Sequence, residues 1–145
     1  MAAERTAKLR ASGDQIPLLL DGIEAEAQAA GVPAGLAAEF RLCLDELLVN
    51  VVNHGAPGPD SEITVHYRVG PDGVWAEIVD AGPAFDPLSL PEPDVEAPLD
   101  ARVPGGLGIY FVRRLMDEVV YERRDAFNRL RLAKRVGAAS TQATF

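Results

Sequence analysis

The sequence predicts a two-layer α/β sandwich of the α+β type, in which three helices cover one face of a mixed, mostly antiparallel sheet. Three observations predict this fold class. Residues 14–54 carry two apolar stripes at helical spacing, which predict two successive helices. Two alternating apolar segments flank the turn-forming Pro71–Gly73, a pattern typical of a β-hairpin. A third helical segment at 107–116 precedes two short alternating segments that complete the sheet.

The N-terminal half is predicted to begin with a short edge strand at residues 5–10, followed by a helix that has Asp14 as its N-cap. This helix is expected to run to about Ala30, because Gly31 favours a helix end. Pro33 fits the first turn of the next helix. The buried side of the first helix is predicted to consist of Ile16, Leu19, Leu20 and Ile23.

The C-terminal half is predicted to supply most of the sheet. Residues 81–104 are rich in proline and have few periodic apolar residues, so they predict a long loop. Because little apolar surface would anchor this loop, we expect it to be mobile. After a Gly- and Pro-rich loop at 55–60, strands are predicted at 63–69, 74–79, 119–123 and 129–134.

Length and composition predict one soluble domain. The 145 residues, 48% of them hydrophobic, can bury a substantial core, and we expect a single domain at 1–145 with a frayed tail at 137–145. The net charge of −8 argues against general nucleic-acid binding. The single cysteine, Cys43, excludes a disulfide framework and is expected to pack in the core. No apolar run is long enough to cross a membrane, so we expect a cytoplasmic protein.

The stretch from Asp45 to Gly55 is the strongest indication of function. Glu46 and Asn50 lie four residues apart at the end of a helical segment and therefore share one helix face with His54. The amide oxygen of an asparagine is a neutral ligand for Mg²⁺, and a nearby carboxylate can accept a proton. A solvated helix face is the alternative explanation for these residues.

Two later motifs favour a nucleotide site, although each also has a structural explanation. Asp80 follows a predicted buried strand, and its carboxylate could accept a hydrogen bond from an exocyclic amine, with Gly82 passing close to a flat ring. The alternative is an ordinary Asp-Gly turn. Gly105–Gly108 opens an apolar helix, where backbone N–H groups favour an anion; the alternative is a flexible turn.

Other common functional sites are excluded because their sequence motifs are absent. The chain has no Walker A loop, no nucleophile elbow and no His-Glu-x-x-His zinc motif. His54 and His66 are too few and too isolated to suggest a zinc site.

The order Glu46-x-x-x-Asn50, Asp80-x-Gly82 and Gly105-Gly-Leu-Gly108 resembles the ATP-binding (Bergerat) fold of the GHKL superfamily, which includes gyrase-type ATPases and histidine kinases. Within it, the chain looks most like the anti-sigma-factor serine/threonine protein kinases. Phe85-Asp86-Pro87 and the segment Asp117–Tyr121 add to this resemblance, which covers residues 8–135.

The resemblance implies a role for each matching residue. Glu46 would act as the general base on an incoming hydroxyl, and Asn50 would bind the Mg²⁺ that accompanies ATP. Asp80 would bind the adenine amine, with Gly82 beneath the ring. The loop at 88–104 would be the ATP lid. The other residues implied at the nucleotide are Phe85, Arg102, Gly105, Gly106, Leu107 and Gly108.

The sequence also departs from the family pattern. Ala84 stands where many members of the superfamily have a second glycine after the aspartate, and the lid has no lysine. Phosphate contacts are therefore left to Arg102 and to backbone amides.

The resemblance further implies the partners. An anti-sigma-factor antagonist would be the protein substrate and a sigma factor the alternative partner, and relatives that form a homodimer are frequent. Two other functions stay open: a module that binds ATP and sequesters a partner without transferring phosphate, and a weak stand-alone ATPase. Glu46 favours a serine/threonine kinase over a histidine kinase, because histidine-kinase versions of the fold generally lack a glutamate at this position; its presence does not decide between phosphoryl transfer and sequestration.

Overall fold

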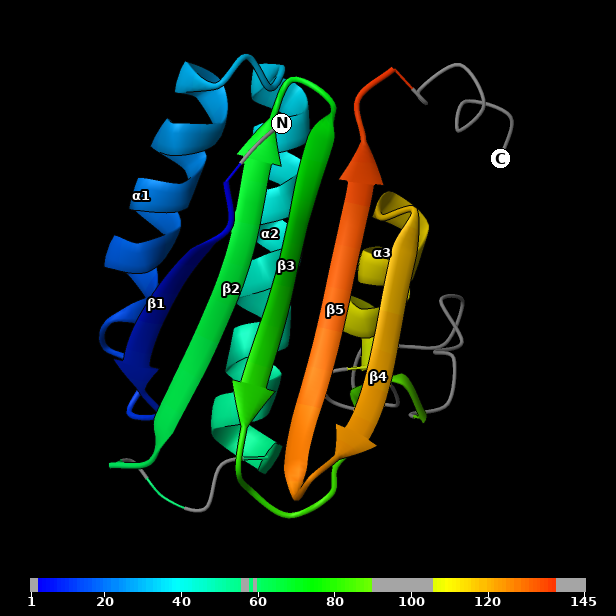
Figure 1. Cartoon of the computed structure of the whole chain (residues 1–145). Coiled ribbons are helices and arrows are strands. Elements are labelled where there is room, and N and C mark those ends of the chain that lie inside the picture. Colours follow the sequence, from blue (N-terminus) through cyan, green and yellow to red (C-terminus); the bar gives the residue numbers. More distant parts are fainter. Residues whose placement is uncertain (1–2, 56–57, 59, 90–105, 138–145) are drawn as a thin grey trace.

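The chain forms two layers, a five-stranded sheet and a set of helices that covers one of its faces (Figure 1). The computed structural model describes residues 3–55, 58, 60–89 and 106–137. The elements in chain order are β1 (Arg5–Arg10), α1 (Ile16–Ala29), α2 (Ala34–Asn50), a short π-helical turn η1 (Val51–Gly55), β2 (Glu62–Gly70), β3 (Gly73–Asp80), a 3₁₀ turn η2 (Pro87–Ser89), α3 (Gly106–Leu115), β4 (Glu118–Arg124) and β5 (Phe127–Arg135). The predicted fold class is confirmed.

The strands lie in the order β1-β2-β3-β5-β4, and each of the four pairings between described strands is antiparallel. Each predicted strand and helix is found within one or two residues of its expected bounds. Of the predicted long loop, residues 81–89 are described and 90–104 lie outside the described part of the chain, as do residues 138–145 of the predicted tail.

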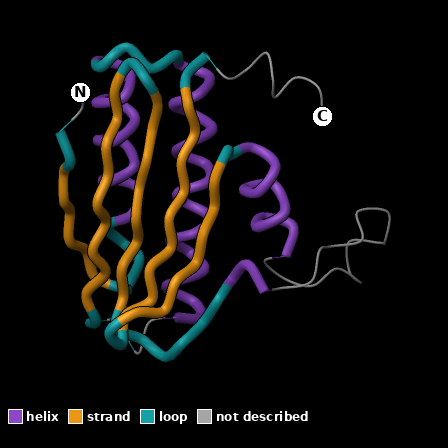
Figure 2. The backbone as a smooth tube through the Cα atoms, turned by 45° about the vertical axis from the view of Figure 1, so that its right-hand side comes forward, coloured by secondary structure: helices purple, strands orange, loops and turns teal. Residues whose placement is uncertain are grey.

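The core lies between the sheet and α2, which is the central helix of the second layer (Figure 2). Alternate strand residues point into this core, as the period-2 pattern requires. The fully buried side chains of α2 include Phe40, Leu44, Leu47 and Leu48, and those of the strands include Ile63, Val65, Ile78 and Leu132. This packing fixes the position of α2 and therefore of the polar residues at its C-terminal end.

The start of α1 differs from the prediction. Asp14 is not its N-cap, because the helix begins one residue later, after Gln15, and has no side-chain cap. The Asp14 carboxylate instead accepts a hydrogen bond from the Ser12 hydroxyl at 2.8 Å. The predicted end of the helix is confirmed: Gly31 has a φ of +94°, a conformation that glycine adopts without strain.

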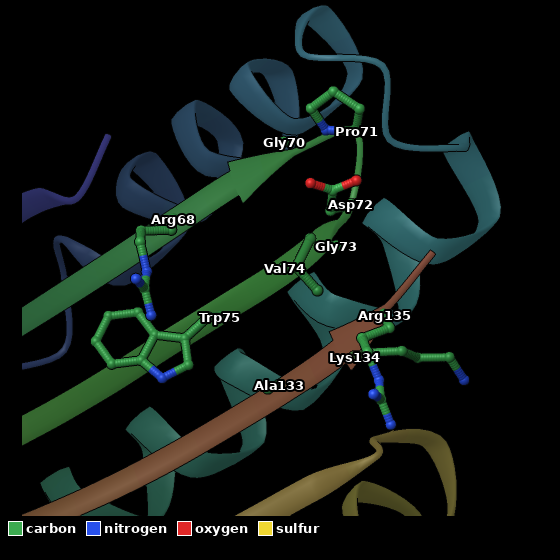
Figure 3. Close-up of a pocket in the computed structure, with 10 residues that line it drawn as sticks. All are labelled: Arg68, Gly70, Pro71, Asp72, Gly73, Val74, Trp75, Ala133, Lys134 and Arg135. Atoms are coloured by element: carbon green, nitrogen blue, oxygen red, sulfur yellow. The ribbon is translucent and has the colours of Figure 1, made fainter. Parts of the chain in front are cut away.

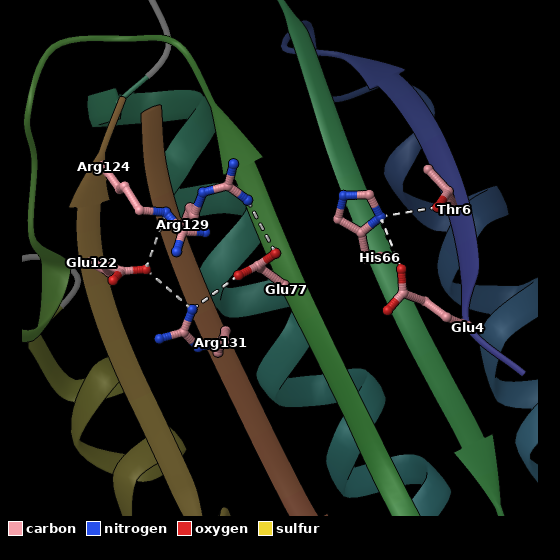
Figure 4. A network of polar contacts seen from close by, with 8 residues as sticks. All are labelled: Glu4, Thr6, His66, Glu77, Glu122, Arg124, Arg129 and Arg131. Carbon is pink, nitrogen blue, oxygen red and sulfur yellow. Dashed lines mark hydrogen bonds and ion pairs between the residues drawn. The ribbon is translucent and has the colours of Figure 1, made fainter. Parts of the chain in front are cut away.

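The other face of the sheet has no described helix over it and carries a network of charged side chains (Figure 4). Glu77 of β3 lies between Arg129 and Arg131 of β5, with carboxylate–guanidinium distances of 3.3 and 3.1 Å. On β2, His66 is hydrogen-bonded to the Thr6 hydroxyl at 2.9 Å. We call this surface the open face.

Two further predictions can be compared with the described residues. None of the described helices combines the length and the apolar character that a membrane span requires. Cys43 is buried in the core, as expected, and this burial raises the pKa of its thiol to about 12.

Candidate active site

The candidate site begins with two side chains of α2, Glu46 and Asn50, which lie on one helix face as predicted. The Asn50 amide nitrogen donates one hydrogen bond to the Glu46 carbonyl oxygen at 2.8 Å and another to the Glu46 carboxylate at 3.1 Å. Asn50 is buried, with only 3% of its surface exposed. Both hydrogen bonds use the amide nitrogen. They therefore orient the amide group. Its oxygen, the atom that a cation would bind, takes part in neither bond.

Glu46 is a half-buried carboxyl group whose described neighbours do not neutralise its charge. Burial is the largest effect, and it raises the pKa of Glu46 above its ordinary value. The negative charge of Asp45 raises this pKa further, whereas the hydrogen bond from Asn50 lowers it. A glutamate in this environment binds a proton more strongly than an ordinary surface glutamate does, which suits a general base.

The glycine-rich start of α3 lies against this carboxyl group. Gly106, Leu107 and Gly108 form the first turn of α3. A Cβ atom placed on Gly108 would lie 2.1 Å from the Glu46 carboxyl carbon, so the two residues are in close contact. The fold therefore brings together the first and third predicted motifs, which are about sixty residues apart in the sequence.

The second motif lies at the end of β3, where Asp80 is buried with 4% of its surface exposed. Its Oδ1 atom accepts a hydrogen bond from the Gly82 backbone N–H at 2.9 Å. The same atom accepts a second hydrogen bond from the Asn128 side-chain amide at 3.1 Å. Asn128 faces Asp80 across the β3–β5 pairing. Because both bonds use Oδ1, the other carboxylate oxygen remains for a further donor.

Asn128 is a site residue that the sequence analysis missed. It is buried and holds the chain that follows β3 in place. The only sequence signal is an asparagine at an inward position of a strand whose next inward residues, Leu130 and Leu132, are apolar. Its amide nitrogen donates to Asp80, Gly82 and Pro83, and its amide oxygen accepts from Phe85, Tyr121 and Arg123.

The segment after β3 also contacts the end of the α2 helix. The Phe85 and His54 rings are 5.4 Å apart between their centroids. Gly82 is buried, and its carbonyl oxygen accepts a hydrogen bond from Arg123 at 2.7 Å. The structure thus places Phe85, Gly82 and Asp80 at the same end of the molecule as the C-terminal end of α2.

Two predicted residues, Arg102 and Gly105, lie outside the described residues. Within the described part of the chain, no group of three or more His, Cys, Asp or Glu side chains is placed to hold a metal ion.

A pocket of about 330 Å³ lies elsewhere, at the hairpin that joins β2 and β3 (Figure 3). Its walls include Trp75, whose ring is covered by the Arg68 guanidinium at 4.4 Å, and Arg135. This hairpin is at the opposite end of β3 from Asp80. No residue of the three motifs lines this pocket, so we do not assign it to the candidate active site.

Comparisons with known proteins match most of the chain. A family model described as the histidine kinase-like ATPase domain matches residues 9–134. The serine/threonine-protein kinase BtrW of Bordetella bronchiseptica is 37% identical over 100 residues, which cover 68% of this chain and 70% of that protein. The serine-protein kinase RsbW of Listeria innocua is 32% identical over 108 residues, 70% of this chain. The chain spans 66% of the length of this Listeria relative.

Proposed function

The chain belongs to the family of histidine kinase-like ATPase domains, and we propose that it is an ATP-dependent serine/threonine protein kinase that acts as an anti-sigma regulatory factor. In this proposal it phosphorylates a small anti-sigma-factor antagonist and binds a sigma factor as its alternative partner. The observation that carries the proposal is the half-buried Glu46 carboxylate, held by Asn50 beside the glycine turn of α3.

Asp80 supplies the contact for the adenine base. Its Oδ1 atom is already occupied by Gly82 and Asn128, so its second oxygen is the acceptor for the exocyclic amine. Because the carboxylate is buried and oriented by two donors, it requires little reorganisation when the base binds. Phe85 and Gly82 would border the base.

The phosphate groups and Mg²⁺ would bind where the C-terminal end of α2 meets the start of α3. Asn50 offers an amide oxygen to Mg²⁺, which neutralises phosphate charge when it is bound. The backbone of Gly106, Leu107 and Gly108, at the start of α3, would surround the phosphates because helix N–H groups there have no partner within the helix. Arg102 and Gly105 complete the proposed phosphate contacts.

Glu46 would accept the proton of the serine or threonine hydroxyl as that oxygen attacks the terminal phosphorus of ATP, while the bond from this phosphorus to the bridging oxygen breaks and ADP leaves. Its raised pKa favours this step, because the carboxylate has a higher affinity for the proton. Asn50 keeps the carboxylate oriented through its hydrogen bond at 3.1 Å. Positioning and charge neutralisation carry most of the catalysis of phosphoryl transfer, so these few residues suffice.

The proposal includes a cytoplasmic location, a role in transcription regulation through the sigma factor, and no direct contact with nucleic acid or a membrane. The negative net charge supports the absence of a nucleic-acid partner. Because the described residues of one chain supply Glu46, Asn50 and Asp80, the proposed site does not itself require a homodimer.

The test is phosphoryl transfer from γ-labelled ATP, in the presence of Mg²⁺, to candidate antagonist proteins of the small single-domain type. We expect labelled phosphoserine or phosphothreonine on one antagonist and no label with the Glu46→Gln variant. Nucleotide turnover without any partner would instead identify an ATPase. Partner binding that depends on ATP but leaves no label would identify a sequestering module.

A further inference from the structure

Gly108 lies where any side chain would collide with Glu46. A Cβ atom built on Gly108 would be 2.1 Å from both Cδ and Oε1 of Glu46 and 2.6 Å from Cγ. Carbon atoms in contact are about 3.5–4.0 Å apart, so even a methyl group would take the space that the carboxyl group occupies. The carboxyl group thus contacts Gly108 near its Oε1 atom and the Asn50 amide through its Oε2 atom.

The helix backbone does not itself require a glycine at this position. Gly108 is not among the residues with positive φ, and it is the third residue of α3. Alanine has the higher helix propensity, so glycine weakens this helix turn. The requirement for a glycine therefore comes from the neighbouring side chain and not from the conformation of α3.

We propose that Gly108 is a positioning residue for Glu46: its missing side chain provides the space in which the Glu46 carboxylate lies against the first turn of α3. The inference rests on the proposed function, in which Glu46 accepts the proton of the substrate hydroxyl. It gives Gly108 a role toward the α2 carboxylate in addition to any contact of its backbone with phosphate.

The expected consequence of a side chain at position 108 is a displaced carboxylate in a folded protein. The three Glu46 atoms that a Cβ would meet are at the far end of a flexible side chain, which can rotate away. Rotation would break the hydrogen bond from Asn50 and move the carboxylate from its half-buried position toward water.

The experiment compares Gly108→Ala with the matched control Gly22→Ala. Gly22 lies within α1, is exposed, and a Cβ placed on it would meet nothing within 4 Å. Both variants are expected to melt at or above the wild-type temperature, because alanine stabilises a helix. Gly22→Ala should keep wild-type transfer, whereas Gly108→Ala should lose roughly 100-fold in kcat, the lower range of a general-base contribution.

A second measurement reports on Glu46 without nucleotide or partner. Crystal structures of wild type and of both glycine variants compare the distance from the Glu46 carboxylate to the Asn50 amide nitrogen, which is 3.1 Å in the wild type. Gly108→Ala should lengthen this distance beyond hydrogen-bond range, whereas Gly22→Ala should keep it.

An unchanged contact between Glu46 and Asn50 in Gly108→Ala would overturn the inference, whatever happens to transfer. If the contact is lost but wild-type protein transfers no phosphate, the positioning role stands and the proposed function fails. If Gly108→Ala does not fold, the variant is repeated with Glu46→Ala, which removes the three colliding atoms. The inference then requires the double variant to fold as Glu46→Ala does, and failure to fold would contradict it.

Discussion

Two glutamates on opposite sides of the sheet show how differently this fold treats a carboxylate. Glu77 of β3 lies on the open face with 11% of its side chain exposed, and each of its oxygens faces an arginine (Figure 4). Glu46 of α2 lies on the helix side, where its described hydrogen-bond partner is the neutral Asn50 and a charged neighbour is Asp45. Among the described residues, arginines neutralise the Glu77 carboxylate, whereas no opposite charge is placed to neutralise that of Glu46.

The difference separates a structural carboxylate from a reactive one. Removing a carboxylate from water is costly unless an opposite charge compensates for it. Arg129 and Arg131 provide that compensation at Glu77. At Glu46 the cost appears as a raised pKa, which gives the group a greater tendency to accept a proton. Uncompensated buried groups of this kind are often found at functional sites.

The largest expected effect distinguishes the two glutamates by activity. Glu46→Gln should reduce phosphoryl transfer about 10²–10⁴-fold, because the amide cannot accept the proton. Binding of Mg-ATP should remain, since Asp80 and Asn50 are unchanged. The matched variant Glu77→Gln should transfer phosphate at the wild-type rate. Equal loss in the two variants, or full transfer by Glu46→Gln, would contradict the assignment.

A third buried carboxylate, that of Asp80, sharpens the comparison because its side-chain partner is the neutral Asn128. Asn128→Ala should lower the free energy of unfolding by about 2–3 kcal/mol, since buried donors and acceptors on Asp80, Tyr121 and the segment after β3 lose their partner. It should also weaken Mg-ATP binding. Urea denaturation and calorimetry measure the two effects, and a variant as stable as wild type would refute the central role of Asn128.

Glu77→Gln should have a smaller effect on stability, about 1–2 kcal/mol, because an amide is a weaker partner for two guanidinium groups. The Nε atom of Arg129 is already buried without a hydrogen-bond partner among the described residues. The control is Glu62→Gln, whose carboxylate is 61% exposed and lies 3.7 Å from Lys8. Its effect should be within about 0.5 kcal/mol. Equal losses in both variants would argue against a special role of the Glu77 network.

The smallest expected effect is a pH dependence that belongs to Glu46. Its pKa is raised in the folded protein, so folding favours the protonated form. This contribution to stability is present below the unfolded-state pKa and is lost as pH rises through the folded-state pKa. Glu46→Gln lacks this titration. The free energy of unfolding of Glu46→Gln, relative to wild type, should therefore increase between pH 4 and pH 7, as urea denaturation at each pH would show. A constant difference would contradict the raised pKa.

The fold was largely predictable because its elements are periodic. The hairpin around Pro71–Gly73 and the helical stripe on α2 both follow from local patterns, and so does the shared face of Glu46 and Asn50. These features depend on residues that are close in the sequence, where helix and strand geometry determine what lies together. The order of the motifs then indicated the family that the comparisons confirmed.

Contacts between distant segments were not predictable from the sequence in the same way. Asn128 lies opposite Asp80 only because β5 pairs with β3 in one register, and no local pattern fixes that register. The contact between Gly108 and Glu46 likewise depends on how α3 packs on α2. The predicted cap at Asp14 was wrong because the N-cap position of α1 is Gln15, one residue later.

The most direct test of the nucleotide site is calorimetric binding of ATP, with and without Mg²⁺, to wild type and to Asp80→Asn. The substitution preserves the size of the side chain but replaces one carboxylate oxygen with a donor, which the adenine amine cannot use. The account predicts Mg²⁺-dependent binding by wild type and its loss in Asp80→Asn. Equal binding by both proteins, or no binding by wild type, would contradict a nucleotide site at Asp80, Asn50 and Glu46.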